Sequence, residues 1–281
     1  MTTARTKRRL LALSGVLVLV AYLGTNSTIS AYLARLVNTT DTVSSAPPDC
    51  HYVPLSDGAT RLYPLNETTG TTAIDESSSA QNGTYQGGRQ TVNASPYACV
   101  RNLEAYPRVD QTHWVSTPGT ISISPTTSSS QEAWVRTVNS QGVAVAIGST
   151  QTAASPSKNL LVLVNSTGRL VFAVQGSGVT YELVSGYSIN DGSWHHVVAV
   201  HDASYGLKLY LDNTLAASQS GVHPTALTGY LRIGYENTNG FTNGFGTDQS
   251  AAHWWDHLAF ISYYPFALTA TQVNSHYQAG R

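Results

Sequence analysis

The sequence predicts an all-β protein, a two-sheet antiparallel jelly-roll sandwich with an N-terminal hydrophobic helix and a short C-terminal helix. Three observations lead to this prediction. Apolar and polar residues alternate with a period of two in Trp194–His201 and Leu207–Asp212, and an Asp-Gly turn at Asp191 precedes the first segment. Turn-forming residues recur about every eight to twelve positions from Cys50 onward. No long helical pattern interrupts them, so the strands need neighbours on both sides and a facing sheet.

Residues 1–30 are predicted to be a signal or anchor segment. The basic cluster Arg5–Arg9 precedes the apolar stretch Leu10–Leu23, which is shorter than the ~20 residues of a membrane-spanning helix. This order is typical of a secretory signal. Without cleavage, Ile29–Val37 could prolong the apolar helix, so a retained anchor stays open and membrane contact would then run through residues 10–37 alone.

The composition favours an extracellular protein. Of the 281 residues 41% are apolar and only 11% are charged, and the formal net charge is −1. A typical soluble domain carries about twice this charged fraction, whereas uncharged hydroxyl- and amide-rich surfaces are common in exported β-proteins. With so little net charge, long-range electrostatics favours neither a nucleic acid nor an anionic membrane as a partner.

Residues 31–49 are interpreted as a linker that ends at Pro47-Pro48, and residues 50–281 as one jelly-roll domain. The turn Asn165–Gly168 predicts a hairpin between two apolar strands. Thr269–Tyr277 is the segment expected to be helical, with Thr269 as its N-cap. The expected strands are 59–65, 98–103, 119–124, 131–138, 143–148, 159–164, 169–175, 179–184, 194–201, 207–212, 214–218, 230–235 and 255–262.

The two cysteines, Cys50 and Cys99, are expected to form a disulfide if the protein is exported. The bridge would close a loop of about fifty residues, worth about 4 kcal/mol in the loop-entropy description. Two reduced, buried thiols are the alternative. Two cysteines without a Cys-x-x-Cys spacing do not make a zinc site by themselves.

Six motifs occur in one order along the chain. They are RLYPLNETTGTTA at Arg61–Ala73, NGTY at Asn82–Tyr85, EAWV at Glu132–Val135, DGSWHHV at Asp191–Val197, LYLD at Leu209–Asp212 and a closing segment at His257–Tyr277. Together they resemble the laminin-G-like, concanavalin A-like lectin/glucanase domains of exported bacterial surface proteins. The resemblance implies the jelly roll but not the ligand, because this fold hosts lectins, glycosidases, adhesion modules and structural domains.

The pattern argues against an enzyme. Glycosidases of this fold resemble one another in a Glu-x-Asp-x-x-Glu strand, whose two carboxylates lie ~5–5.5 Å apart. Here Ala133 and Trp134 follow Glu132, which is expected to be a hydrogen-bonding partner at a strand end. His195 and His196 point to opposite faces of one strand, so they cannot bind one metal together and are expected to serve packing.

Aromatic rings that stack on sugars, beside amides that read hydroxyl groups, would make a carbohydrate site. The pair Trp254-Trp255 and the long loop 234–246 offer such groups. The resemblance also leaves open one calcium ion, or no cofactor at all. The candidate ligand-binding residues are Trp254, Trp255, Tyr235, Asn237, Phe241 and Asn243, and the candidate calcium donors are Asp191, Asp212, Glu236 and Asp248.

The favoured interpretation is therefore an exported, secreted or cell-surface, non-catalytic binding or adhesion module. Its expected partner is a carbohydrate or a surface protein. The alternative is a structural subunit of a surface filament or tail-like assembly, a homo-oligomer that keeps the N-terminal helix. A glycoside hydrolase is the weaker alternative, and it predicts two carboxylates within about 5–10 Å of each other in a cleft.

Overall fold

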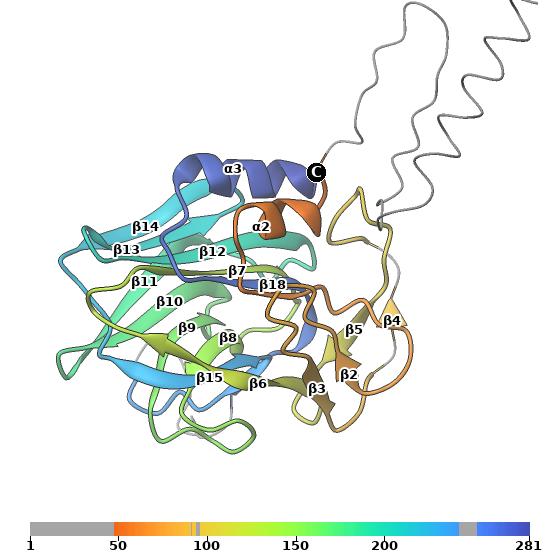
Figure 1. Ribbon diagram of the computed structural model, residues 1–281, viewed down its shortest axis with the longest axis horizontal. Helices are drawn as coiled ribbons and strands as arrows, with labels where there is room; N and C mark the ends of the chain where they lie inside the picture. Colours follow the sequence, from red (N-terminus) through yellow and green to blue (C-terminus); the bar gives the residue numbers. More distant parts are fainter. Residues whose placement is uncertain (1–47, 91, 94–95, 242–251) are drawn as a thin grey trace, which may run out of the picture. The chain divides into compact units, whose positions relative to one another are not determined.

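The computed structural model describes residues 48–90, 92–93, 96–241 and 252–281. Two antiparallel sheets pack face to face in this part of the chain, with two helices beside them (Figure 1), which confirms the predicted sandwich. The predicted N-terminal helix and most of the linker lie outside the described residues. Within them, no helix has both the length and the apolar character needed to cross a membrane.

The first sheet contains the strand of the DGSWHHV motif in its interior. Its strands are β1 (Arg61–Tyr63), β4 (Val92–Asn93), β5 (Tyr106–Val109), β7 (Ser129–Arg136), β12 (Trp194–Asp202), β13 (Gly206–Leu211), β14 (Thr214–Ser220) and β18 (Asp256–Tyr264). Their order is β14-β13-β12-β7-β18-β5-β4, with β1 also paired to β18. His196 lies opposite Trp134, so the EAWV and DGSWHHV motifs are neighbours in space.

The second sheet is built mainly from hairpins. Its strands are β2 (Thr72–Ala73), β3 (Gly83–Gln86), β6 (Trp114–Ile123), β8 (Gly142–Gly148), β9 (Lys158–Val164), β10 (Arg169–Gly176), β11 (Val179–Ser188) and β15 (Leu227–Ile233). Their order is β11-β10-β9-β8-β15-β6-β3-β2. The predicted turn joins β9 to β10: the Asn165 side chain accepts the Arg169 amide at 3.0 Å, and Gly168 takes a φ of 75°. A small separate sheet pairs β16 (Tyr235–Glu236) with β17 (Ala252–His253).

The period of two in β12 divides its side chains between two packing layers. Val197 and Ala199 belong to the main core, which also contains apolar residues of the second sheet. Trp194 and Val198 belong instead to clusters that include residues of the helical segments. The strand is thus buried on both faces, because a sheet lies on one side and helices lie on the other.

Two helices cover the outer face of the first sheet, α2 (Tyr52–Ser56) and α3 (Ala270–Ala279) (Figure 1). The predicted C-terminal helix and its cap are confirmed. The Thr269 hydroxyl accepts the Gln272 amide at 3.2 Å, and the Gln272 side chain accepts the Thr269 amide at 3.0 Å. This reciprocal pair satisfies two backbone donors that the first turn of a helix leaves free.

The predicted strand 98–103 is wrong. The segment turns back on itself through a single bridge between Cys99 and Asn102. The Cys50–Cys99 disulfide is present as predicted, and the Cys50 amide donates to the Asn102 side chain at 3.3 Å. Since the crosslink and this bond hold both ends of the turn, the segment does not extend as a strand.

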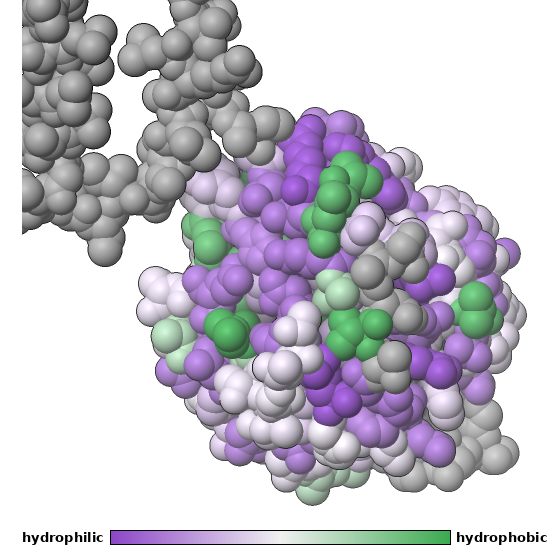
Figure 2. Space-filling view, turned by 90° about the vertical axis from the view of Figure 1, so that its right-hand side faces the viewer, coloured by the Kyte–Doolittle hydropathy of each residue, from purple (hydrophilic) through white to green (hydrophobic). Residues whose placement is uncertain are grey.

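Large exposed hydrophobic side chains are scattered among the described residues. They are Tyr52, Ile74, Val100, Leu103, Val138, Val179, Tyr187, Tyr205 and Leu215. On the face drawn in Figure 2 the hydrophobic residues form small groups separated by hydrophilic ones. Scattered apolar residues of this kind are ordinary on a soluble domain.

A candidate ligand-binding pocket around His195

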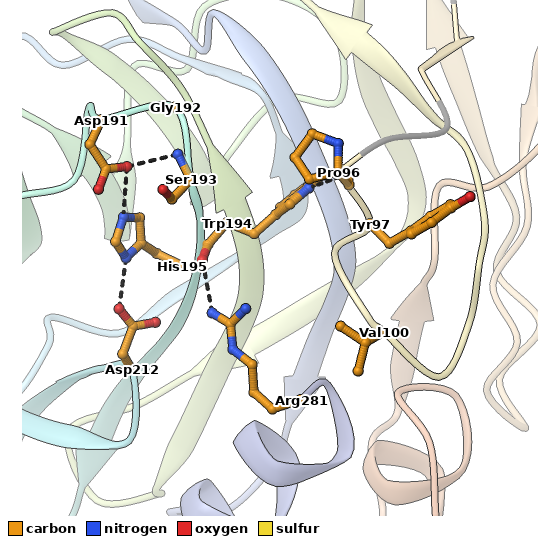
Figure 3. A pocket seen from close by; sticks show the side chains of 10 residues that line it. All are labelled: Pro96, Tyr97, Val100, Asp191, Gly192, Ser193, Trp194, His195, Asp212 and Arg281. Carbon is orange, nitrogen blue, oxygen red and sulfur yellow. Dashed lines mark hydrogen bonds and ion pairs between the residues drawn. The ribbon is translucent and has the colours of Figure 1, made fainter.

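A pocket of about 630 Å³ opens where β12 begins (Figure 3). Its volume lies within the ~300–1,000 Å³ of typical small-ligand sites. Four parts of the chain contribute to it: the turn before β12, the turn after β13, the end of α3, and residues 96–100 around Cys99, which we call the disulfide segment. Its lining residues are Pro96, Tyr97, Val100, Asp191, Gly192, Ser193, Trp194, His195, Asp212 and Arg281.

His195 lies between two carboxylates in this pocket (Figure 3). Its Nδ1 is 2.7 Å from Asp212 Oδ2, and its Nε2 is 3.2 Å from Asp191 Oδ1. Both aspartates are held by the backbone as well: Asp191 accepts the Ser193 amide at 2.7 Å, and Asp212 accepts the His196 amide at 2.9 Å. The turns that border β12 and β13 therefore fix the imidazole on both sides.

These contacts set the charges of all three groups. Burial disfavours the charged form of His195, but hydrogen bonds and charges from Asp212 and Asp191 outweigh burial and raise its pKa. Burial also disfavours the two carboxylates. The Ser193 amide and His195 nevertheless lower the pKa of Asp191, and His195 and the His196 amide lower that of Asp212. The cluster thus favours an imidazolium flanked by two carboxylates.

Arg281 enters the pocket from the residues that follow α3. Its Nη2 donates to the Trp194 carbonyl at 3.0 Å. Its Cζ lies 5.0 Å from the ring centre of Trp134 and 5.3 Å from that of Tyr277, so the guanidinium rests on aromatic faces. Its positive charge also helps to lower the pKa of Asp212.

The remaining wall comes from the disulfide segment. Tyr97 and Val100 flank Cys99, and Val100 is about half exposed. The Val100 amide donates to the Gly280 carbonyl at 3.1 Å, and the Trp194 indole donates to the Pro96 carbonyl at 2.8 Å. The wall is thereby tied to the end of α3 and to β12.

The predicted aromatic site near Trp254 is not formed by the described residues. Trp254 and Phe241 are each 1% exposed, Trp254 in the main core and Phe241 in a cluster with residues of β8, β9 and β10. Tyr235 is also buried and stacks on His253 with ring centres 4.4 Å apart. Their rings pack against protein, so they offer no face to a sugar.

The other predicted ligand residues are dispersed. Trp255 is partly exposed, and the Asn237 side chain donates to the Ser155 carbonyl at 3.2 Å. Asn243 lies outside the described residues. Neither Trp255 nor Asn237 contributes to the lining of the pocket around His195.

The predicted calcium donors do not converge either. Asp191 and Asp212 do meet, but His195 lies between them and supplies a positive charge there. Glu236 is fully buried elsewhere and accepts the amide and hydroxyl of Ser155 at 3.1 and 2.8 Å. Asp248 lies outside the described residues. In the part of the chain that the structure describes, no three His, Cys, Asp or Glu side chains are arranged to hold a metal ion.

Glu132 is a buried ion-pair partner in the interior of β7, not a group at a strand end. It accepts His196 Nε2 at 2.7 Å and His276 Nδ1 at 2.8 Å, and the Tyr264 hydroxyl also donates to it. Although burial opposes ionisation, the charge of His276 and the hydrogen bonds keep the pKa of Glu132 well below its usual range. The opposite orientations predicted for His195 and His196 are confirmed by their separate partners.

The sequence therefore indicated two of the pocket residues, Asp191 and Asp212, as candidate calcium donors. It missed the role of His195, which was expected to serve packing, and it missed Arg281, Ser193 and Tyr97 altogether. The Asp-Gly turn at Asp191, which precedes a buried histidine, was the available signal for His195. No local pattern marks Arg281, since only the docking of α3 brings it to the pocket.

A family model described as the concanavalin A-like lectin/glucanases superfamily matches residues 109–273. A search of curated protein sequences gave no match. The family match and the observed sandwich confirm the resemblance inferred from the six motifs.

Several solved toxin domains share the fold. The binding domain of Paraclostridial mosquitocidal protein 1 superposes with a TM-score of 0.58 at 13% identity, over 79% of this chain and 52% of that one. The botulinum neurotoxin serotype G binding domain gives 0.55 at 12% identity, over 79% and 51%. The serotype D ligand-binding domain, solved with N-acetylneuraminic acid, gives 0.52 at 12% identity, over 80% and 51%. The chain spans about half the length of these structures, and at such identities the likeness is one of fold.

Proposed function

Because the chain belongs to the concanavalin A-like lectin/glucanases superfamily, we propose that it is a non-catalytic binding module that takes a carbohydrate in the pocket around His195. The observation that carries the proposal is the meeting of ionised Asp191 and Arg281 with the apolar side chain of Val100 in one pocket. Sugar recognition needs this mixture, since hydroxyl groups require convergent polar partners and the C–H faces require apolar contact. The similar toxin structures are binding domains, and one was solved with a sugar acid.

The charges around the pocket favour a neutral saccharide. Asp191 and Asp212 contribute two negative charges, and His195 and Arg281 contribute two positive ones. The side chain of Asp191 is 57% exposed, so it can accept hydrogen bonds from sugar hydroxyls while Arg281 donates to sugar oxygens. Because the guanidinium and the imidazole offset the two carboxylates, the lining side chains present no strong charge of one sign to an anionic or a cationic ligand.

The same geometry argues against hydrolysis at this site. A glycosidase needs one carboxyl group whose raised pKa keeps it protonated as the general acid. His195 instead lowers the pKa of both Asp191 and Asp212. Glu132 is enclosed by its histidine and tyrosine partners. These carboxylates are suited to accepting hydrogen bonds, not to donating a proton.

An exported location accompanies this proposal. The Cys50–Cys99 disulfide supports this location, because disulfides persist mainly in oxidising compartments, whereas cytosolic thiols are kept reduced. The charged fraction of only 11% is also typical of secreted β-proteins. We place the module outside the cell, secreted or at the cell surface.

A glycan array followed by calorimetry on the full chain tests the proposal, with Asp191→Asn as the pocket variant. Asp202→Asn is the matched control. Asp202 also accepts a hydrogen bond from a turn amide, that of Ser204 at 3.0 Å, and forms an ion pair with Lys208 at 3.0 Å. It lies outside the pocket. We expect a neutral glycan to bind and Asp191→Asn to weaken it about tenfold or more, which is about 1.4 kcal/mol. Asp202→Asn should leave the affinity unchanged. An array without any bound glycan, or equal losses in both variants, would overturn the proposal.

A further inference from the structure

The end of α3 is seated tightly beside the pocket. The Gly280 carbonyl accepts the Val100 amide at 3.1 Å. Gly280 lies so close to Trp134 that a Cβ at this position would be 2.2 Å from ring atom Cζ2. Since its φ of −89° suits any residue, the close approach to Trp134 is what requires glycine here. The position of Arg281 thus depends on how closely α3 lies on the first sheet.

A buried ion-pair cluster holds α3 in that position. His276 is 2% exposed, and its Nδ1 is 2.8 Å from Glu132 Oε2 while its Nε2 is 3.1 Å from Asp57 Oδ2. Glu132 belongs to β7 and Asp57 follows α2, so one side chain joins three elements. The other polar groups at this cluster are the Tyr264 hydroxyl of β18 and His196 of β12, both bonded to Glu132.

Trp134 connects this cluster to the pocket. It lies two residues after Glu132 on β7, and its ring is 5.0 Å from that of His196 and 6.2 Å from that of Tyr277, in a stacked arrangement. The guanidinium of Arg281 rests on the same ring at 5.0 Å. Two side chains of β7 therefore contact α3 and the residues after it. Glu132 binds His276, and Trp134 contacts both Tyr277 and Arg281.

We propose that His276 is a positioning residue of the carbohydrate site: its bonds to Glu132 and Asp57 seat α3 on the first sheet, and this seating holds Arg281 at the pocket. Affinity for the glycan and docking of α3 are then coupled, since a ligand that contacts Arg281 binds the docked helix better than a displaced one. The proposal rests on the function proposed above for the pocket.

A double-mutant cycle in the full chain tests the coupling through binding. His276→Gln and Arg281→Ala should each lower the affinity for the glycan about tenfold, and the double variant should lower it no more than either single change. Multiplied losses of about a hundredfold would overturn the proposal, because they would mean that His276 acts independently of Arg281. Thr269→Ala, which removes the cap at the other end of α3, is the control and should leave affinity unchanged.

A second variant covers the case in which His276→Gln fails to fold. Asp57→Asn removes the negative charge from one partner of His276 and leaves the bond to Glu132 in place. It should lower the affinity for the glycan severalfold, and it should cause no further loss of affinity in a chain that already carries Arg281→Ala. A loss of the same size in the Arg281→Ala background would contradict the coupling.

The seating of α3 is also measurable without a ligand. The Val100 amide donates to the Gly280 carbonyl, so its rate of hydrogen–deuterium exchange reports whether the end of α3 is docked. This rate should become at least tenfold faster in Asp57→Asn and stay unchanged in Thr269→Ala. Unchanged exchange in Asp57→Asn would overturn the positioning role even if glycans bind. If the wild-type chain binds no glycan but the Val100 amide responds, the proposed function fails while the control of α3 by His276 stands.

Discussion

Asp212 Oδ2 lies 2.7 Å from His195 Nδ1, and this contact joins the turn after β13 to the first residues of β12. Asp212 adopts a positive φ of 48° at that turn, which aspartate tolerates better than most residues. Its other oxygen accepts the His196 amide. One carboxylate thus bonds to the backbone of β12 and favours the charged form of the neighbouring imidazole.

Replacement of Asp212 by asparagine should lower the pKa of His195. An amide cannot supply the negative charge that now outweighs the burial of the ring. An NMR titration of the histidine Cε1 protons would measure the change. Asp202→Asn serves as the control here as well, and a pKa of His195 that stays at its wild-type value would contradict the arrangement.

The ion pairs of His276 predict a loss of stability at high pH. Burial disfavours the imidazolium, but Glu132 and Asp57 raise the pKa of His276 to about 9, above the ordinary 6.5. The folded protein therefore holds a proton that the unfolded chain releases between these values. This contribution, about 3 kcal/mol at 1.36 kcal/mol per pKa unit, is complete below pH 6.5 and is lost as the pH rises through 9.

Urea unfolding at pH 6, 8 and 10 would measure this loss. His51 has a pKa raised to about 10, so it adds to the same window, and the comparison must be made against His276→Gln. The difference in unfolding free energy between wild type and variant should shrink as the pH rises. A difference that is constant from pH 6 to pH 10 would show that His276 does not titrate in the folded state.

Gly280→Ala should destabilise the protein by about 1–3 kcal/mol, the usual cost of overpacking a filled site. The added methyl group would meet the ring of Trp134, which is itself buried. Gly186→Ala is a suitable control, because nothing lies within 4 Å of the added Cβ at that position. Thermal unfolding of the two variants compares them, and equal midpoints would rule out the tight contact.

Removal of the Cys50–Cys99 disulfide should weaken both stability and glycan binding. The crosslink restricts the unfolded chain by about 4 kcal/mol at most in the loop-entropy description. It also holds the segment that carries Tyr97 and Val100. Calorimetry of the Cys50→Ser/Cys99→Ser variant should show a lower affinity, and an unchanged affinity would remove this segment from the site.

N-terminal sequencing of the protein purified from its own source would show whether the predicted signal or anchor segment, residues 1–30, is cleaved. A start near residues 28–47 agrees with a secreted or surface-bound module. A start at or before Leu10 would instead favour the membrane-anchored or filament alternative. Intact mass gives an independent measurement of the same boundary.

The sandwich could be predicted from sequence because its signals are local. Alternation in Trp194–His201, the turn Asn165–Gly168 and the cap at Thr269 each depend on residues a few positions apart. The disulfide was expected from the presence of two cysteines together with the premise of export. The prediction failed at 98–103, where a crosslink and a long-range hydrogen bond replace strand pairing.

The pocket could not be predicted because its parts are distant in sequence. Asp191, Asp212, Val100 and Arg281 meet only after β12, β13, the disulfide segment and α3 have packed together. Burial also depends on this packing, and it places Trp254 in the core although its residue type suggested a sugar-binding surface. Local propensity and alternation determined the strands and their faces, whereas the charge of His195 and the position of Arg281 depend on contacts that only the tertiary structure creates.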